Sequence, residues 1–430
     1  MKTLINESVY KYFKQISQIP RQSGNETEIK NYLINFAKER NLKYYSDKYN
    51  NVIIYKQTCN KDSVILHAHT DMVCVKALNK NFAFETDKIE ILQKQNFLIA
   101  NDTTLGADNG IGVAIILSIL DTSLPVNIEA LFTATEETTM QGAYKIDTSK
   151  LQSKNLICLD GFNQNEIITS TSSFTDFLVK FDKQKKALQN NNLKFFKISV
   201  DGLIGGHSGS DIDKCRLNPH KMLAKILQNI KDYYLLDFFG GKNFNVIPSN
   251  SNCVIASPLN KTQIKKIVNK SIVFYKRSLK NTIKNIKIRQ NQTLSDKDFK
   301  QSFYVNTKKQ KESLIKELKT QIKQLKINLN NVQPQKDYYV YGKSFINFIN
   351  LFNQGVLIKN KGLQVEISQN LSEVNIKNAE LKIGIRSSVK NAEKTYIKRL
   401  LELAHQNHMV GNVVDTQPGF STKLRSKLKQ

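Results

Sequence analysis

The first 160 residues alternate between short, largely apolar segments and longer segments in which apolar residues recur every three to four positions. The longer segments predict amphipathic helices over residues 3–20 and 25–40, with Ser23 or Asn25 capping the second helix and Glu28 in its first turn. The short apolar segments predict strands that are buried on both faces. They cover residues 52–55, 64–66, 130–135 and 156–159. This order of elements predicts an α/β domain with a mostly parallel, layered sheet.

From about residue 174 the pattern changes to strands in which apolar and polar positions alternate. The strands expected here cover residues 177–181, 195–200, 363–367 and 381–385, and the helices cover 219–233, 261–288 and 308–329. We interpret residues 173–389 as a second, α+β domain inserted into the first. An amphipathic helix over residues 391–409 is assigned back to the first domain, which then comprises residues 1–172 and 390–430.

The strand at residues 64–66 leads directly into His67, His69 and Asp71, within the run Leu-His-Ala-His-Thr-Asp-Met-Val. Alternate residues of a strand point to the same side, so these side chains are expected to emerge together at its carboxyl end. A neutral imidazole is a metal ligand, and a nearby carboxylate can fix its tautomer or act as a ligand itself. By itself, the motif also fits a polar residue that is satisfied at a strand end.

Acidic residues at the ends of other predicted elements favour the metal interpretation. Asp108 precedes the apolar segment 113–120, where it would fall at a helix start, while Glu136 and Glu137 follow one predicted strand and Asp160 follows another. Sites in open α/β sheets gather outside the carboxyl ends of strands. The sequence therefore predicts that these acids and the histidines converge on one crevice.

The composition is that of a globular protein, and 430 residues with 40% hydrophobic content allow two or three domains. No apolar run approaches the ~18 residues that span a membrane, and residues 1–15 lack the apolar core of a signal peptide. The five cysteines form no Cys-x-x-Cys pair, which argues against a disulfide framework and a structural zinc cluster. We therefore expect a cytoplasmic protein that does not contact membranes.

The formal net charge of +27 would attract polyanions, and nucleic-acid binding by the Lys-rich region 261–329 is one interpretation. The charge is spread along a chain that is also rich in Asn and Ile, and no recognisable nucleic-acid module accompanies it. We favour a solvated basic surface and do not expect nucleic acid as a partner.

An ordered set of short motifs along nearly the whole chain resembles one family. The motifs are His-Ala-His-Thr-Asp-Met-Val (67–73), Thr-Leu-Gly-Ala-Asp-Asn-Gly-Ile-Gly (104–112), Thr-Glu-Glu (135–137), Leu-Asp (159–160) and Gly-Gly-His-Ser-Gly (205–209), with further runs at 19–25, 240–248, 368–371 and 385–388. They resemble the aminoacyl-histidine dipeptidases, also called Xaa-His dipeptidase or peptidase D, among the co-catalytic zinc metallopeptidases that include carboxypeptidase G, di- and tripeptidases and carnosinases. The resemblance implies a zinc-exopeptidase-like mixed sheet layered with helices, with an inserted α+β lid domain.

The resemblance also implies a site for two divalent metal ions. The ligands that it implies are His69 and Asp160 for one ion, Glu137 for the other, and Asp108 as a bridge between them. Asp71 would fix the His69 ring, and His67 has no implied role. Zinc suits this set of nitrogen and oxygen donors, and manganese or cobalt would fit as well.

The implied activity is hydrolysis of Xaa-His and related dipeptides by a metal-bridged water. Glu136 is the expected general base, which would pass the proton of that water to the leaving amine. His207 is implied to reach the substrate carbonyl oxygen, in some relatives from a partner subunit, and closure of the lid would exclude water. Arg386 and Asn245 are candidates for binding the substrate carboxylate, although a surface ion pair would explain Arg386 as well. Relatives commonly pair, so a homodimer is a further expectation.

The sequence departs from the family pattern at its end. The family pattern continues past the segment that resembles residues 413–420 to a run His-Ala-Gly-Leu-Glu-Cys-Gly, whose histidine completes the second metal site, and this sequence lacks that run. His405 and His408 lie earlier, in the predicted helix, and do not replace it. Because the sequence has no tryptophan, one hypothesis is that a UGA codon for Trp was read as a stop. The alternative function is a catalytically impaired or inactive pseudo-peptidase of the same fold.

Overall fold

The computed structural model describes residues 2–59, 62–95, 97–161, 166–189, 192–288, 308–360 and 364–420. The chain forms two compact units, of which the first ends at Ile168 and the second begins at Thr169. The sequence placed this boundary a few residues later, between residues 172 and 173. We refer to the two parts as unit 1 and unit 2 and describe each separately.

Unit 1 is built on a five-stranded mixed sheet. Its strands, in spatial order, are β1 (Lys43–Ser46), β2 (Val52–Lys56), β6 (Asn127–Thr133), β3 (Ser63–His69) and β7 (Leu156–Cys158). The central strand β3 runs parallel to both β6 and β7, whereas β2 runs antiparallel to β6. A separate hairpin joins β4 (Ile91–Lys94) to β5 (Phe97–Ala100). The predicted mixed sheet is thus confirmed, and three adjacent strands end at the same edge.

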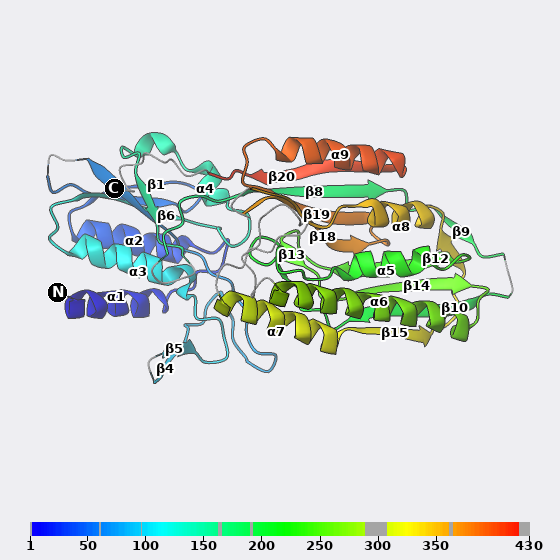
Figure 1. The fold of residues 1–430 in the computed structure, drawn as a ribbon. Coiled ribbons are helices and arrows are strands. Elements are labelled where there is room, and N and C mark those ends of the chain that lie inside the picture. Colours follow the sequence, from blue (N-terminus) through cyan, green and yellow to red (C-terminus); the bar gives the residue numbers. More distant parts are fainter. Residues whose placement is uncertain are drawn as a thin grey trace. The chain divides into compact units, whose positions relative to one another are not determined.

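Helices cover one face of this sheet. They are α1 (Lys2–Ile16), α2 (Thr27–Glu39) and α3 (Ala107–Asp121), which lie side by side (Figure 1). Phe13, Leu33, Leu117 and Phe132 belong to the core between helices and strands. The opposite face packs Ile53, together with Ile65 and Leu131, against residues that flank α4 (Gln141–Lys145) and the 3-10 helix η1 (Thr148–Lys150). Since both faces are covered, every residue of β6 is buried.

The start of α2 differs from the prediction. Neither Ser23 nor Asn25 caps this helix; the residue before it is Glu26, whose side chain makes no capping hydrogen bond. Ser23 instead donates its hydroxyl to the Asp71 carboxylate, 2.7 Å away. The capping pattern was recognisable in sequence, but a tertiary partner competes for the same hydroxyl.

Unit 2 is built on a nine-stranded antiparallel sheet. In spatial order its strands are β15 (Lys326–Asn331), β10 (Lys194–Asp201), β14 (Ser251–Ser257), β12 (Tyr234–Gly241), β18 (Val365–Asn375), β19 (Glu380–Ser387), β8 (Ser173–Phe181) and β20 (Met409–Gln417), with β17 (Gly355–Lys359) paired to β18. Two short pairs accompany it. They are β9 (Lys185–Ala187) with β16 (Asp337–Tyr339), and β11 (Gly206–His207) with β13 (Val246–Ile247).

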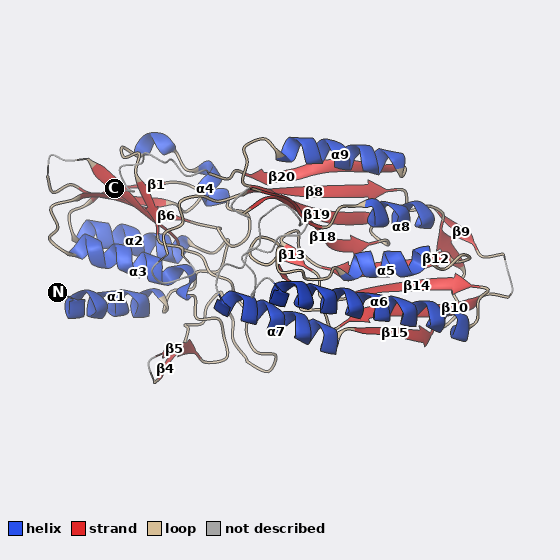
Figure 2. Ribbon diagram, viewed as in Figure 1, coloured by secondary structure: helices blue, strands red, loops and turns tan. Residues whose placement is uncertain are grey.

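The helices of unit 2 are α5 (Pro219–Gln228), α6 (Lys261–Ile288), α7 (Lys308–Gln324), α8 (Gly342–Leu351) and α9 (Glu393–Gln406), and Figure 2 shows α5, α6 and α8 lying over the strands. The core between helices and sheet includes Phe177, Leu223, Phe238, Phe345 and Ile383, all fully buried. This is the α+β arrangement that the sequence predicted. Among the described helices, none is both long and apolar enough to cross a membrane.

Two sequence assignments in unit 2 are wrong. The helix predicted over 308–329 ends at Gln324, because the following residues form β15, where Ile327 and Leu329 pack against the core beside β10. The segment after residue 390 was assigned to the first domain, yet β20 pairs with β8, and α9 packs Leu400 and Ala404 into the core of unit 2. The amphipathic pattern of a helix indicates that one of its faces packs against a core, but the pattern does not indicate which sheet that core belongs to. Residues 421–430 of the predicted segment 390–430, and residue 363 of the strand predicted over 363–367, lie outside the described residues.

Candidate active site

The predicted acids of unit 1 converge on His69, the last residue of β3. Because β6, β3 and β7 are parallel neighbours, the loops that carry Glu136, Glu137 and Asp160 leave the same sheet edge. The Nε2 atom of His69 lies 3.0 Å from Asp108 Oδ1 and 3.9 Å from both Glu136 Oε2 and Asp160 Oδ2. The side chains predicted from strand-end positions to lie close together therefore do so in this unit.

These side chains fall into two groups that could each hold a metal ion. One group contains His69, Asp108 and Asp160, and the other contains His69, Glu136 and Glu137; within each group the ligand atoms lie within 4.8 Å of one another. The first group contains the two residues expected to share an ion and the expected bridge. The donors are one imidazole nitrogen and carboxylate oxygens, a set that suits zinc, manganese or cobalt. The residues present therefore fit divalent metal ions.

Asp71 holds the cluster together from behind. It is fully buried, and its carboxylate accepts the main-chain N–H groups of Glu136 (2.9 Å) and Glu137 (3.1 Å). The Nδ1 atom of His69 lies 3.1 Å from the carbonyl oxygen and 3.4 Å from the carboxylate of Asp71. An Nδ1–H that donates to Asp71 leaves the Nε2 lone pair directed at the acids, which is the tautomer that a metal ligand needs.

Two buried charged residues support the same loops and were not predicted. The Arg21 guanidinium donates to the carbonyls of Thr70 (3.0 Å) and Gly106. The Glu26 carboxylate accepts the N–H groups of Gly24 (2.9 Å) and Thr135 (3.0 Å). Arg21 lies in the run 19–25 that contributed to the family resemblance, so the sequence contained a signal, but no periodicity indicated that this arginine is buried.

His67 does not face the cluster. Its Nε2 lies 2.9 Å from the Thr133 hydroxyl and its Nδ1 lies 3.1 Å from the Cys158 sulfur. Burial, together with the charge of His69, lowers the pKa of His67 to about 4. His67 is thus a neutral residue satisfied within the sheet, in keeping with the lack of a role expected for it.

The cluster carries more negative charge than its surroundings balance. Burial raises the pKa of Glu136 to about 7, an effect that His69 opposes and Asp160 and Glu137 reinforce. Burial likewise raises the pKa values of Glu137 and Asp160. Burial alone would lower the pKa of His69, but the Asp71 hydrogen bond and the charges of Glu136 and Asp160 raise it to about 9. A bound cation would relieve the repulsion among the acids and displace the proton from His69.

The predicted residues of unit 2 form a cluster of their own. His207 lies on β11, and its Nε2 is 3.3 Å from the Nη2 atom of Arg386 on β19. Arg386 also donates to the Ser208 hydroxyl (3.2 Å) and stacks over the Phe174 ring at 4.3 Å. Asn245 contributes its main-chain oxygen, which accepts the N–H of Ser208 (2.8 Å), while its side chain is exposed.

Arg386 is partly buried. Among the described residues no carboxylate lies within ion-pairing distance of its guanidinium, so the surface ion pair considered from sequence is absent there. Burial lowers the pKa of Arg386 to about 10, and Asp176 opposes that shift. Burial also lowers the pKa of His207, as does the charge of Arg386. This cluster therefore contains the neutral imidazole of His207 and the half-buried guanidinium of Arg386, which lacks a counterion in the described part of the chain.

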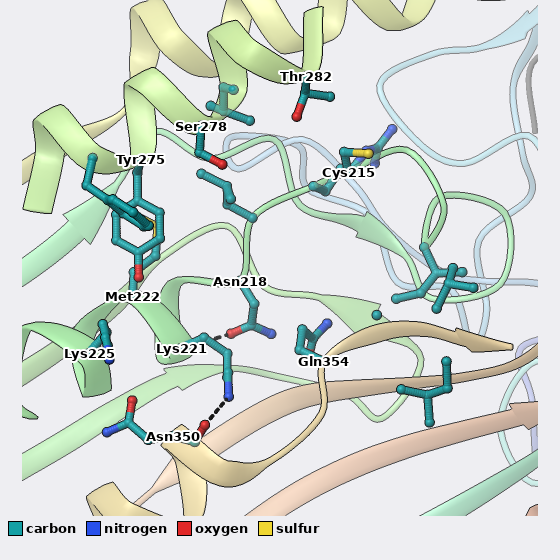
Figure 3. Close-up of a pocket in the computed structure, with 18 of the residues that line it drawn as sticks. Cys215, Asn218, Lys221, Met222, Lys225, Tyr275, Ser278, Thr282, Asn350 and Gln354 are labelled. Atoms are coloured by element: carbon teal, nitrogen blue, oxygen red, sulfur yellow. Dashed lines mark hydrogen bonds between the residues drawn. The ribbon is translucent and has the colours of Figure 1, made fainter. Parts of the chain in front are cut away.

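A large pocket of unit 2 lies apart from these residues. Its volume is about 930 Å³, and it is lined by parts of α5, α6, α8 and β17 (Figure 3). The ammonium group of Lys221 donates to the carbonyl oxygens of Ile349 (2.7 Å), Asn350 (2.9 Å) and Phe352 (2.6 Å) at the end of α8. Since that charge is satisfied and none of the predicted site residues lines the pocket, the chemistry is expected at His69 and His207 rather than here.

The chain is similar in sequence and in fold to known dipeptidases. No family model matches the chain. The chain is 31% identical over 307 residues to the cytosol non-specific dipeptidase of Escherichia coli (strain K12). That match spans 69% of this chain and 63% of the relative, which is less than two thirds of its length. Among solved structures, the aminoacylhistidine dipeptidase from Vibrio alginolyticus has the same fold, with a TM-score of 0.71 and 24% identity over 98% of this chain and 81% of that one.

Proposed function

We propose that this chain, which belongs to the dipeptidase family of the cytosol non-specific and aminoacylhistidine dipeptidases, is a metal-dependent dipeptidase. The reaction would be hydrolysis of the single peptide bond of a dipeptide. We further propose Xaa-His dipeptides as preferred substrates. One observation carries the proposal: four acids from three segments of the chain form two groups that share His69 of β3, and within each group the ligand atoms lie within 4.8 Å of one another.

In this proposal His69, Asp108 and Asp160 hold one divalent ion, and Glu137 holds a second that Asp108 shares. When bound, such a pair of ions polarises a scissile carbonyl and lowers the pKa of water. We propose zinc, while the donor set also suits manganese or cobalt. Asp71 holds Nδ1 of His69, so Nε2 is the nitrogen that would bind the ion once its proton is displaced.

Glu136 is the proposed general base. Its carboxylate lies 3.9 Å from His69 Nε2, beside the proposed ligands, and burial raises its pKa, so it accepts a proton more readily than an exposed glutamate would. Its main-chain N–H is held by Asp71, which fixes the start of the side chain. The Glu136 carboxylate would accept a proton from the attacking water and deliver it to the leaving amine.

His207 and Arg386 are proposed to bind oxygen atoms of the substrate. The planar guanidinium of Arg386 suits the C-terminal carboxylate, and the imidazole of His207 suits the carbonyl oxygen that becomes negatively charged. Asn245 is a weaker candidate for the same carboxylate, since its contact with Ser208 uses the main chain and leaves the amide exposed.

The test compares Glu136→Gln with Glu85→Gln, a change at an exposed glutamate of the same unit. We expect Glu136→Gln to retain about two metal ions per chain by elemental analysis and to hydrolyse dipeptides about 10²- to 10⁴-fold more slowly. Glu85→Gln should match the unchanged protein in both measurements. Equal turnover by both variants would refute the proposed role of Glu136 as general base.

The same measurements separate the alternative function. Metal binding at one ion or none, together with no hydrolysis of any dipeptide by the unchanged protein, would favour an inactive pseudo-peptidase. A panel with Ala-His, His-Ala and Ala-Ala tests the preference for C-terminal histidine, since equal kcat/KM values would reject it. We also propose a cytosolic location and formation of a homodimer, which cell fractionation and sedimentation would test.

A further inference from the structure

Both ring nitrogens of His207 face hydrogen-bond donors. The Nδ1 atom lies 3.3 Å from the main-chain nitrogen of Gly209 and 3.4 Å from that of Ser210. The Nε2 atom lies 3.3 Å from Nη2 of Arg386. A neutral imidazole has one N–H and one acceptor nitrogen, so it cannot accept from both sides at once.

The two sides of the ring differ in how firmly their donors are held. The N–H groups of Gly209 and Ser210 belong to the same tight turn as His207, and they cannot leave Nδ1 unless the turn opens. Arg386 reaches Nε2 with the end of a long side chain, which can move. The acceptor is therefore Nδ1, and the proton resides on Nε2 beside the guanidinium.

The partly buried carboxylate of Asp211 fixes the turn that imposes this choice. The Oδ2 atom of Asp211 accepts the main-chain N–H of His207 (2.8 Å), and the N–H of Asp211 donates to the His207 carbonyl (3.0 Å). Arg216 pairs with the same carboxylate at 2.9 Å, and Lys214 pairs with its other oxygen at 2.8 Å. The hydrogen bond from Lys214, with those from His207 and the charge of Arg216, outweighs burial and keeps the pKa of Asp211 low, so it remains ionised.

Arg216 ties the turn to the rest of unit 2. Its side chain is only 10% exposed, and it donates to the Gly205 carbonyl and to Glu317 of α7 (3.2 Å) as well as to Asp211. Gly206, at φ 137°, lies against this pair, and a Cβ atom there would collide with both Arg216 and Asp211. The turn therefore requires glycine at 206 and the Asp211–Arg216 pair behind it.

We propose that Asp211 and Arg216 are positioning residues that hold His207 in its Nε2–H tautomer. The consequence for the substrate rests on the proposed function. Nε2–H of His207 and the Arg386 guanidinium form two adjacent donors for one anionic oxygen of the substrate. Without that oxygen the two donors face each other, which is unfavourable. With it, both are satisfied.

The tautomer can be measured without any activity. We would label the histidines of the full chain with ¹⁵N, assign the His207 signals with His207→Gln, and record the two ring nitrogens at about pH 8. We expect a protonated Nε2 and an unprotonated Nδ1 in the unchanged protein, and a mixture of tautomers in Asp211→Ala. A proton on Nδ1 in the unchanged protein would overturn the proposal.

Asp213→Ala is the matched control, since Asp213 is two residues away and its carboxylate takes no part in the hydrogen bonds that hold the described turn. It should leave the His207 signals unchanged. Asp211→Asn keeps an acceptor for the His207 N–H but loses the charge, so it should shift the tautomer less than Asp211→Ala. If Asp211→Ala does not fold, the ring-nitrogen signals of His207 are measured in Asp211→Asn and Arg216→Lys instead. Unchanged signals in both variants would overturn the proposal.

Kinetics then connect the tautomer to the proposed reaction. We expect Asp211→Ala to lower kcat roughly ten- to a hundredfold with a smaller change in KM, because a displaced donor acts mainly on the developing charge. Asp213→Ala should leave both constants unchanged. If no dipeptide is hydrolysed while the tautomers behave as expected, the proposed function fails and the positioning role stands. If Asp211→Ala is folded and active and its His207 tautomer is unaltered, the positioning role fails and the proposed function stands.

Discussion

The two clusters described here are electrostatic opposites. In unit 1, acids crowd around His69, and burial together with mutual repulsion raises the pKa values of Glu136 and Asp160. In unit 2, Arg386 and His207 direct donors at each other, and burial lowers the pKa values of both. Neither arrangement is favourable by itself. Each becomes favourable with a ligand of the opposite charge, a metal cation at the first and an anionic oxygen at the second.

The clusters also share a construction principle. In each, one ionised aspartate accepts main-chain N–H groups of the loop that carries functional side chains. Asp71 holds the N–H groups of Glu136 and Glu137, and Asp211 holds that of His207. A carboxylate behind the loop can keep groups close together that would otherwise repel one another. The comparison teaches that an ionised aspartate can hold the loop of a site whether the groups that act there are acidic or basic.

The largest effect should come from removing the proposed bridge. Metal ions contribute several kcal/mol to a transition state of this kind, and each ~1.4 kcal/mol is a factor of ten in rate. We expect Asp108→Ala to reduce hydrolysis by about 10³-fold or more and to reduce the metal content per chain. The control is Asp147→Ala, an exposed acid of the same unit. Full activity in Asp108→Ala would show that the acid cluster does not hold the catalytic metal ions in the proposed way.

A smaller effect is expected behind the cluster. Asp71→Asn keeps the shape of the side chain but weakens its bonds to the Glu136 and Glu137 N–H groups and its hold on His69. Partners that orient a metal ligand typically change metal affinity by about 10- to 100-fold. Titration of the metal-free variant with zinc would measure this. An unchanged affinity would show that Asp71 stabilises the fold alone.

The cluster of unit 2 is tested by Arg386→Lys, which keeps the charge but loses the planar fork. We expect KM to rise about tenfold, corresponding to ~1.5 kcal/mol for a charged hydrogen bond, with metal content unchanged. Arg399→Lys, on the exposed surface of α9, serves as the control. A loss of metal instead of a rise in KM would contradict the different roles proposed for the two clusters.

The smallest effect concerns His220, a buried histidine among neutral groups. Its Nδ1 lies 2.8 Å from the Ser251 hydroxyl, and burial lowers its pKa to about 3. Because the unfolded chain binds this proton near pH 6.5, the stability that His220 contributes is present above that pH and lost as the pH falls toward 3. Between pH 7.5 and 5.5 the loss should be about 1 kcal/mol.

Urea unfolding of the metal-free protein, followed by circular dichroism, would show this loss as a difference from His220→Phe. The two proteins should differ in their pH dependence, whatever the constant cost of the substitution. Parallel pH dependences would mean that His220 is protonated in the folded state, and burial alone would then not explain the behaviour of the functional histidines.

Much of unit 1 could be predicted from sequence because its signals are local. Apolar runs followed by His69, Glu137 or Asp160 identify buried strands and the residues at their ends, and parallel strands bring those ends together. The ordered motifs identified the family, which the comparisons confirmed. The individual roles of His69, Asp108 and Glu136 remain predictions that the variants above test.

Other features depended on contacts between distant segments. The periodicity of α9 indicated a helix with one apolar face, but only the pairing of β20 with β8 placed it in unit 2. Ser23 had the sequence of a helix cap, yet Asp71, 48 residues away, binds its hydroxyl. Nothing local indicated that Arg21 is buried beneath the acid cluster or that Asp211 lies beneath His207.

The sequence by itself determined which chemical groups this protein carries and on which kinds of element, because hydrophobic period and residue type act over a few positions. The tertiary structure decided which groups meet, which charges are buried and which tautomer a histidine adopts. Those properties depend on burial and on hydrogen bonds between segments far apart in the chain, and their strength depends on how little water remains around them.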